Sequence, residues 1–270
     1  MAYRKFKIDF SDKAAIRTGT DGYQLKFVKD DYFIKAQCEL QGCLKKDWRV
    51  EVIATEICKF YSVYAVLQRP CMIDISKSGK IYGRYGVYSN NFEKNGYTFV
   101  SCERLFNLNQ DILNTRVYIK LDARQKLYYI AERISVYAGL DKTKVLNYLF
   151  NMLFVDLLVL NQDRHSHNFG VFWNNNKNQY EVAMLFDFGM GLFENTNDKY
   201  NTLDEYLRYS YLEPFGEDPF YLAEVFLKDN NFMAFLKNKQ SSGLLNISDR
   251  IFPSKLAYMY FCKMKEVLKV

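Results

Sequence analysis

The chain has 270 residues, 49% of them hydrophobic, which is enough apolar material for one large domain or for two lobes that share a cleft. This composition excludes a chain that is disordered throughout. The 37 Lys and Arg residues outnumber the 31 Asp and Glu residues, giving a net charge of +6, but the basic residues are dispersed along the chain. We interpret them as a solvated surface and expect no stable binding of nucleic acid.

We expect neither a secretion signal nor a membrane span. The positive charges of the first residues have no apolar run behind them. The most apolar stretch, 145–160, is interrupted by polar residues and is too short to cross a bilayer, so it predicts a buried helix. The 6 cysteines form no C-x-x-C pair, and 2 histidines leave few ligands for a zinc site. We interpret the cysteines as reduced thiols of a cytoplasmic protein.

Residues 1–90 are expected to be rich in strands, because clusters of Gly, Asp and Asn separate short runs of Tyr, Phe, Val and Ile. The turns of two hairpins are predicted at 29–31 and 78–80. One helix is expected between them, from the spacing of its apolar residues. The predicted elements are strands over 23–28 and 32–36, a helix over 48–61, and strands over 71–75 and 82–88.

From about residue 100 the pattern predicts helices. The first covers 123–137 and is closed by Gly139, and the second covers 142–160 and is capped by Asp141. Apolar residues recur in the second helix at intervals of three and four, which predicts burial on a broad face. A hairpin is expected next, with strands over 169–173 and 180–186 joined by a run of turn-forming residues.

Polar residues at the two ends of this last hairpin are suited to phosphoryl transfer. Asp163 and Asn168 are five positions apart, a spacing that lets one loop place a carboxylate at a nucleophile and an amide oxygen on a metal ion. Asp187 ends the hairpin, where a second carboxylate can reach the same metal from the other side. Each residue alone is explained equally well as part of a turn. Together they indicate a site for phosphoryl transfer.

The motifs that contain these residues have a family resemblance. The loop reads N-Q-D-R-H-S-H-N over 161–168, and L-F-D-F-G follows over 185–189. This pair resembles the HipA-like serine/threonine kinases of bacteria, including their short CtkA-type members, and more distantly the phosphatidylinositol 3/4-kinases. In those families the loop reads Asp-Arg-His, the reverse of the His-Arg-Asp order of ordinary protein kinases. The resemblance is strong over 161–189 and extends in outline over 17–215.

The resemblance implies an α+β fold of the two-lobed protein-kinase-like type, which uses ATP and Mg²⁺. The strand-rich N-lobe would cover 1–90 and the mainly helical C-lobe 91–270. In this fold Asp163 would be the catalytic base, and Asn168 and Asp187 would be the magnesium ligands.

The N-terminal half supplies further residues that match kinase positions. Lys35, near the end of the strand over 32–36, resembles the strand lysine that contacts the nucleotide phosphates. Glu51 on the next helix is placed to pair with it, or Glu56 if the helix register differs. The segment 18–26 resembles the phosphate loop of the family. The residues that we assign to nucleotide binding, with Lys35, are Gly19, Gly22, Gln24 and Tyr88.

Two pairs of residues carry further expectations. HipA-like kinases carry hydroxyl residues in the phosphate loop that become autophosphorylated, so the resemblance suggests Thr18 and Thr20 as the acceptors. His165 is expected to brace the catalytic loop in the core, and His167 to lie at the surface. Neither histidine is expected to bind a metal.

Three functions remain open at this point. The first is a protein Ser/Thr kinase, as a bacterial toxin or an effector delivered to a host cell; the second is a lipid kinase; the third is a partner-binding pseudokinase. Competent residues at every named catalytic position argue against the third. Acidic residues across 190–220 suit a basic peptide better than a phosphoinositide head group. The pattern names neither the substrate nor the oligomeric state.

Overall fold

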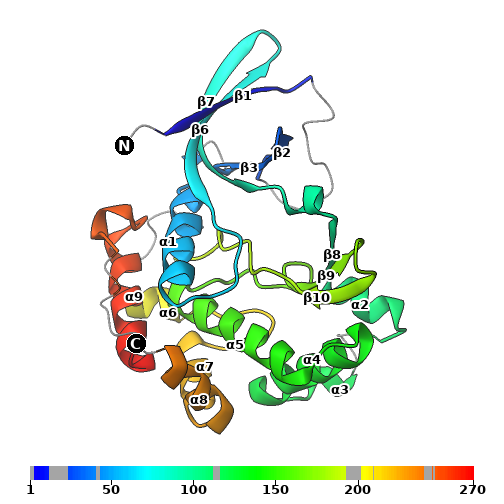
Figure 1. Cartoon of the computed structure of the whole chain (residues 1–270). Helices are drawn as coiled ribbons and strands as arrows, with labels where there is room; N and C mark the ends of the chain where they lie inside the picture. The colour runs from blue at the N-terminus through cyan, green and yellow to red at the C-terminus, as the bar shows by residue number, and fades with distance from the viewer. Residues whose placement is uncertain are drawn as a thin grey trace.

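The computed structural model describes residues 3–11, 24–40, 43–111, 116–192, 202–208, 210–239, 245 and 247–270. Figure 1 shows a curled, strand-rich N-terminal part above a mostly helical part. The predicted order, strands first and helices after them, is therefore confirmed. Within the described ranges no helix combines the length and the apolar character that a membrane span requires.

Five strands form the N-terminal sheet, in the spatial order β1-β6-β7-β3-β2. β1 runs parallel to β6, and the other neighbours are antiparallel. Both predicted hairpins are confirmed, β2-β3 and β6-β7, whereas β1 was not predicted. The strands are β1 (Arg4–Asp9), β2 (Lys26–Lys29), β3 (Tyr32–Ala36), β6 (Arg69–Lys77) and β7 (Lys80–Asn90), beside a short separate ribbon of β4 (Glu39–Leu40) and β5 (Cys43–Leu44).

The two faces of the sheet have different partners. One face holds a small core of its own, with Phe27, Ile34 and Ile73 fully buried. On the other face Val87 packs against side chains of α1 (Asp47–Phe60). Lys35 is the register partner of Val87, and directly opposed residues share a face of a sheet, so Lys35 lies on the α1 side. A side chain at Gly86 would collide with the carbonyl oxygen of Lys35, which explains the glycine there.

The helix α1 links the sheet to the helical part. It was predicted over 48–61, and the observed bounds differ by one residue at each end. Val50, Ile53 and Ile57 are fully buried and belong to the main core below the sheet. A segment near the C-terminus also reaches α1, because the Lys46 ammonium donates to the carbonyl oxygen of Pro253 at 3.0 Å. These contacts fix α1 between three parts of the fold.

The helical part is built around α5, whose side chains are buried along most of its length. Asp141 caps its first turn, as predicted, and the Asp122 side chain with Gln125 forms a capping box at α4. Gly139 ends α4 in the left-handed conformation, also as predicted. The helices are α2 (Cys102–Leu108), α3 (Arg116–Ile119), α4 (Ala123–Ala138), α5 (Lys142–Val159), α6 (Leu203–Leu207), α7 (Pro219–Leu227), α8 (Asn230–Lys239) and α9 (Lys255–Leu268), with short 3-10 turns η1 (Phe92–Asn95) and η2 (Asp249–Ile251).

A second sheet has three strands, in the spatial order β10-β9-β8. Its strands are β8 (Tyr97–Ser101), β9 (Gly170–Asn174) and β10 (Gln179–Val182). The last predicted strand was expected to continue to residue 186, and this bound is wrong. The chain leaves the hairpin after Val182 because Leu185 pairs instead with the connection after α1: its N–H donates to Tyr64 at 3.0 Å, and its carbonyl accepts from Val66 at 2.8 Å.

Candidate functional site

The loop after α5 is organised by a buried arginine. Arg164 is fully buried and donates to both carboxylate oxygens of Asp156, at 2.9 and 3.0 Å. Its remaining guanidinium nitrogen donates to the carbonyl oxygens of Asn168 at 2.9 Å and Phe186 at 2.7 Å. One side chain therefore joins α5, the loop over 161–168 and the segment just before Asp187. Such a pair satisfies its own buried charges because the geometry is bidentate.

This arrangement corrects the role expected for His165. The His165 side chain is 43% exposed and its Nε2 lies 4.0 Å from Asp163 Oδ2, so it does not brace the loop in the core. Arg164 does so instead, together with Asn161, whose amide donates to Asp156 at 2.9 Å. His167 is exposed, as expected, and its Nε2 lies 2.8 Å from a carboxylate oxygen of Glu103.

Asp163 and Asn168 are brought together by the loop. The Asn168 amide nitrogen donates to the carbonyl oxygen of Asp163 at 2.9 Å, which leaves the amide oxygen able to bind a cation. The Asp163 side chain is 46% exposed and so remains accessible to a substrate. Partial burial raises the pKa of the Asp163 carboxyl and the nearby Asp187 carboxylate adds to this, while His165 acts in the opposite direction. A raised pKa makes the carboxylate a better proton acceptor.

Lys35, Glu51 and Asp187 form one connected cluster. The Lys35 ammonium lies 2.8 Å from Glu51 Oε1 and 2.8 Å from Asp187 Oδ1. The pairing predicted for Glu51 is thus present, and Glu56 is instead paired with Lys59 at the surface. Asp187 has φ of 63°, a left-handed conformation that turns the chain sharply after the hairpin. Three segments distant in the sequence thus meet at one ammonium group.

The opposite charges in this cluster stabilise each other's ionised forms. Burial alone would lower the pKa of Lys35, but the Asp187 and Glu51 carboxylates outweigh it and raise that pKa. Burial likewise opposes ionisation of Asp187, yet Lys35 and Lys26 hold its pKa well below the usual range. Lys26, the last residue of the segment that resembles the phosphate loop, lies 3.5 Å from Asp187 Oδ2 and is a second cation at this point. Two ammonium groups flanking a carboxylate suit the phosphates of a nucleotide with a metal ion.

The predicted role of Lys35 in contacting nucleotide phosphates has a direct test: Lys35→Met is expected to lower phosphoryl-transfer activity by about 10²-fold or more and to weaken ATP affinity, because it removes an ammonium group from a partly closed site. The matched control is Lys59→Met, which removes a lysine that also pairs with a glutamate of α1 at 2.8 Å, but with both side chains about half exposed. Calorimetric ATP binding and initial rates check both. Unchanged rate and affinity in Lys35→Met would remove Lys35 from the site.

A further buried carboxylate, Asp47, begins α1 and was not predicted to be at the site. Its side chain accepts from Gln24 Nε2 at 2.7 Å and from the backbone N–H of Cys38 at 3.0 Å. Burial raises the pKa of Asp47 to about 6, and the neighbouring Glu51 carboxylate adds to the effect. The Asp47 charge is therefore maintained at neutral pH at a cost in folding free energy.

This cost predicts a pH-dependent difference between the wild type and Asp47→Asn. Because the pKa of Asp47 is raised from 3.8 to about 6 on folding, its protonated form contributes stability below pH 3.8 that is lost as pH rises through 6. Asn does not titrate in this range. The free energy of unfolding of the variant, relative to that of the wild type, should therefore increase by up to about 3 kcal/mol as the pH rises from below 3.8 to above 6. Urea unfolding at several pH values measures this. An equal stability difference at pH 4 and pH 7.5 would contradict it.

The remaining predicted nucleotide-binding residues are not gathered here. Tyr88 lies on the other face of the sheet from Lys35, with its ring 5.3 Å from that of Phe6 and 5.4 Å from that of Tyr32. Its assignment to nucleotide binding is therefore corrected to a role in the core of the sheet, because side chains alternate between faces and its register partner is Ile34. Gly19 and Gly22 lie outside the described residues.

The donors that could hold a magnesium ion are few. Among the described residues no group of three or more His, Cys, Asp or Glu side chains could hold a metal ion on its own. Mg²⁺ in phosphotransferases is bound by one or two protein carboxylates together with substrate phosphates and water. The oxygen donors of Asn168 and Asp187 fit that limited role, since neither is a soft ligand and Arg164 joins their two segments by donating to the carbonyl oxygens of Asn168 and Phe186.

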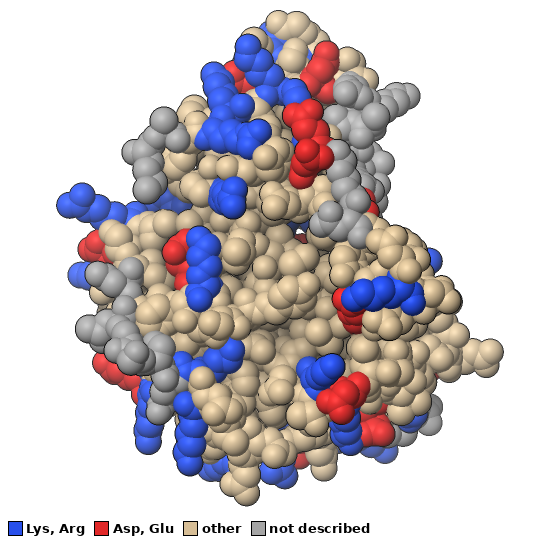
Figure 2. Space-filling model, in the orientation of Figure 1, with Lys and Arg blue, Asp and Glu red and all other residues tan. Residues whose placement is uncertain are grey.

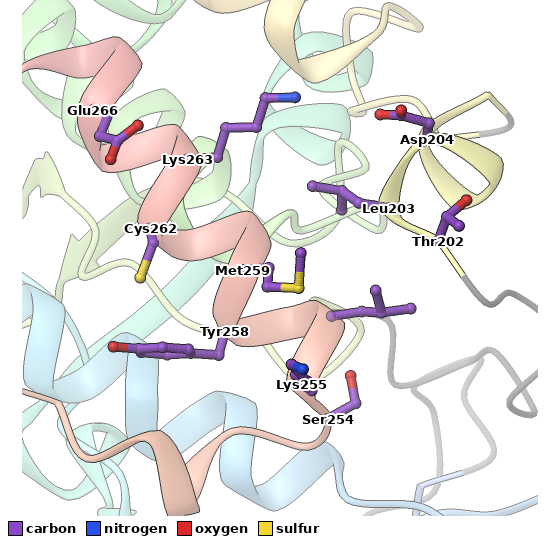
Figure 3. Close-up of a pocket in the computed structure, with 11 residues that line it drawn as sticks. Thr202, Leu203, Asp204, Ser254, Lys255, Tyr258, Met259, Cys262, Lys263 and Glu266 are labelled. Atoms are coloured by element: carbon purple, nitrogen blue, oxygen red, sulfur yellow. The ribbon is translucent and has the colours of Figure 1, made fainter.

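A separate cavity of about 950 Å³ lies between α6 and α9. Figure 3 shows Leu203 and Asp204 on one side of it and Met259 and Lys263 on the other. None of the predicted catalytic residues lines this cavity. Figure 2 shows Lys and Arg side chains gathered on the N-terminal sheet and more scattered below it, many beside Asp or Glu.

The architecture is similar to that of a solved kinase. The chain matches the crystal structure of the Helicobacter pylori proinflammatory kinase CtkA with a TM-score of 0.65 at 15% sequence identity, over 98% of this chain and 96% of that chain. No protein-family model matches the sequence, and no curated protein matches it. The likeness confirms the predicted α+β fold of the kinase-like type. Membership of the HipA-like kinases stays a prediction.

Proposed function

We propose that this protein is an ATP- and Mg²⁺-dependent kinase that transfers the γ-phosphoryl group to serine or threonine of protein substrates. The observation that carries the proposal is the convergence of the Lys35–Glu51–Asp187 cluster with the loop that holds Asp163 and Asn168. The Asn161 amide of this loop donates to the carbonyl oxygen of Asp187 at 3.4 Å. This convergence occurs in a fold similar to that of a kinase. The lobes would correspond to residues 1–90 and 91–270.

Each side chain has a distinct task in this proposal. Lys35 and Lys26 bind the nucleotide phosphates, and Glu51 holds Lys35 in position. Asp163 accepts the proton of the attacking hydroxyl, for which its partial exposure and raised pKa are suited. Asn168 and Asp187 bind the magnesium ion, which when present neutralises negative charge on the transferring phosphoryl group.

The choice of a protein acceptor is supported by charge. Acidic side chains follow the metal-binding turn on α6 and in the stretch before α7, and they would attract a basic peptide while repelling an anionic lipid head group. The described acidic residues of this region are Asp204, Glu205, Glu213, Glu217 and Asp218.

The acceptor class is tested with γ-labelled ATP and Mg²⁺, offered together with lysate proteins or with phosphoinositide vesicles. The proposal expects label on serine or threonine of protein bands. Label on lipid would replace it by a lipid kinase, and no label with intact ATP binding would indicate a pseudokinase. The Asp163→Ala variant, run in parallel, excludes a contaminating kinase.

Autophosphorylation is expected at Thr18 or Thr20, which lie outside the described residues and are selected by the family resemblance. A phosphate there would add about −1.5 to −2 charge near the nucleotide phosphates and should inhibit ATP binding by repulsion. Mass spectrometry after incubation with ATP, compared with Asp163→Ala, measures it. Active enzyme without phosphate on peptides that contain these threonines would rule out the hypothesis.

A further inference from the structure

The Asp47 carboxylate lies where three segments of the site meet. It is the first residue of α1, and it accepts hydrogen bonds from Gln24 before β2 and from the backbone of Cys38 after β3. Gly189, just after Asp187, is close as well: a Cβ atom there would lie 3.6 Å from the Asp47 Cβ. Asp47 therefore binds the chain just before β2 and just after β3, the strands that carry the two site lysines, and lies close to the turn that follows Asp187.

Within the described part of the chain, Asp47 is buried without an ion-pair partner of its own. Its exposed fraction is 4%, and no ion pair within the described part of the chain includes it. The charged groups that face it are the Glu51 carboxylate on its own helix, which repels it, and the Lys35 ammonium on β3, which is bound to other carboxylates. A carboxylate that served only to stabilise the start of α1 could lie at the surface, where its charge would not have to be desolvated.

The hydrogen bond from Gln24 connects the Asp47 carboxylate to the segment that leads into β2. Gln24 lies two residues before Lys26, whose ammonium reaches Asp187 at 3.5 Å. Gln24 was predicted to contact the nucleotide, but its amide nitrogen is instead 2.7 Å from Asp47 Oδ2. Fixing Gln24 to α1 fixes the start of β2, and with it the place of Lys26 above Asp187.

We propose that Asp47 is a positioning residue that, by binding the Gln24 side chain, holds Lys26 of β2 in place to receive the phosphates of ATP. The inference rests on the proposed function. In this inference the Gln24 side chain fixes the start of β2 to α1, the helix that carries Glu51. Lys26 of β2 then contacts the phosphates. Loss of the anchor should weaken nucleotide binding more than it slows transfer from bound nucleotide.

The test is a double-mutant cycle on Gln24→Ala and Asp47→Ala, with KM for ATP and kcat measured at saturating Mg²⁺. Each single variant is expected to raise KM by about fivefold or more with kcat within about twofold, and the double variant to match the larger single effect, because both break one contact. Asp47→Asn keeps an oxygen that can accept from Gln24 and Cys38, so its KM should stay within about twofold of the wild type.

ATP affinity measured by calorimetry without an acceptor gives a second readout that does not depend on phosphoryl transfer. Independent, multiplying effects of the two substitutions would overturn the proposal. So would a KM equal to the wild type in Gln24→Ala, or an Asp47→Ala variant that only loses folded fraction at unchanged KM. A wild type that binds no ATP would instead contradict the proposed function itself.

Discussion

Asp187→Ala is expected to reduce phosphoryl transfer by about 10³-fold or more and to abolish most of the Mg²⁺ dependence of ATP binding, because it removes the carboxylate that we propose as a metal ligand. Asp163→Ala should cause a loss of activity of similar size but leave Mg²⁺-dependent ATP binding nearly unchanged, since it removes only the proposed proton acceptor. Rates and calorimetric titrations with and without Mg²⁺ separate the two roles.

The matched control for both substitutions is Asp9→Ala, on the edge strand β1, where the carboxylate contacts Ser11 at the surface. That variant should be as active as the wild type. Folding should survive in all three proteins, as judged by their thermal unfolding. Wild-type activity in both Asp163→Ala and Asp187→Ala would show that the site assignment is wrong.

Arg164→Met is expected to destabilise the protein by about 3–5 kcal/mol, because it leaves the buried Asp156 carboxylate without its cation. It also removes the donor to the carbonyl oxygens of Asn168 and Phe186, so the loop over 161–168 should lose its fixed position. Urea unfolding measures the first effect. Kinetics of the folded fraction measure the second, which should appear as a lower kcat.

The control for Arg164 is Arg133→Met, which removes an arginine whose Nε lies 3.4 Å from Asp111 with the arginine side chain 42% exposed. A surface pair of this kind is worth about 1 kcal/mol or less. If Arg164→Met unfolded within about 1 kcal/mol of the wild type, Arg164 would not be the brace that its contacts indicate.

Much of the site could be predicted because its residues sit in motifs of fixed spacing. The interval between Asp163 and Asn168 and the position of Asp187 are visible in the sequence, and the family resemblance suggested the role of each residue. Lys35 and Glu51 could be paired because they resemble the strand lysine and the helix glutamate of kinases, and the structure brings the two side chains within 2.8 Å.

The buried supports could not be found in the same way. Asp156 was noted merely as an interruption of an apolar helix, and Arg164 as one letter of a motif. An aspartate in the middle of a buried helix is itself a signal, since such a charge is rarely buried without a partner. Asp47 resembled an ordinary residue at a helix start, and nothing local indicated that Gln24, 23 positions earlier, would reach it.

Elements that depend on distant pairing were also missed. β1 alternates charged and apolar residues, but its partner is β6, more than sixty residues away and parallel to it. β8 has its partner in β9, beyond two long helices. A short strand gains stability from such a neighbour rather than from its own residues, so its sequence alone predicts it weakly.

A crystal structure of the protein with a non-hydrolysable ATP analogue, and with Mn²⁺ in place of Mg²⁺, would test the proposed site most directly. We expect an anomalous Mn²⁺ peak in contact with Asn168 and Asp187, and nucleotide phosphates beside Lys35 and Lys26. Nucleotide bound elsewhere, such as in the cavity between α6 and α9, with no metal peak between Asn168 and Asp187, would contradict it.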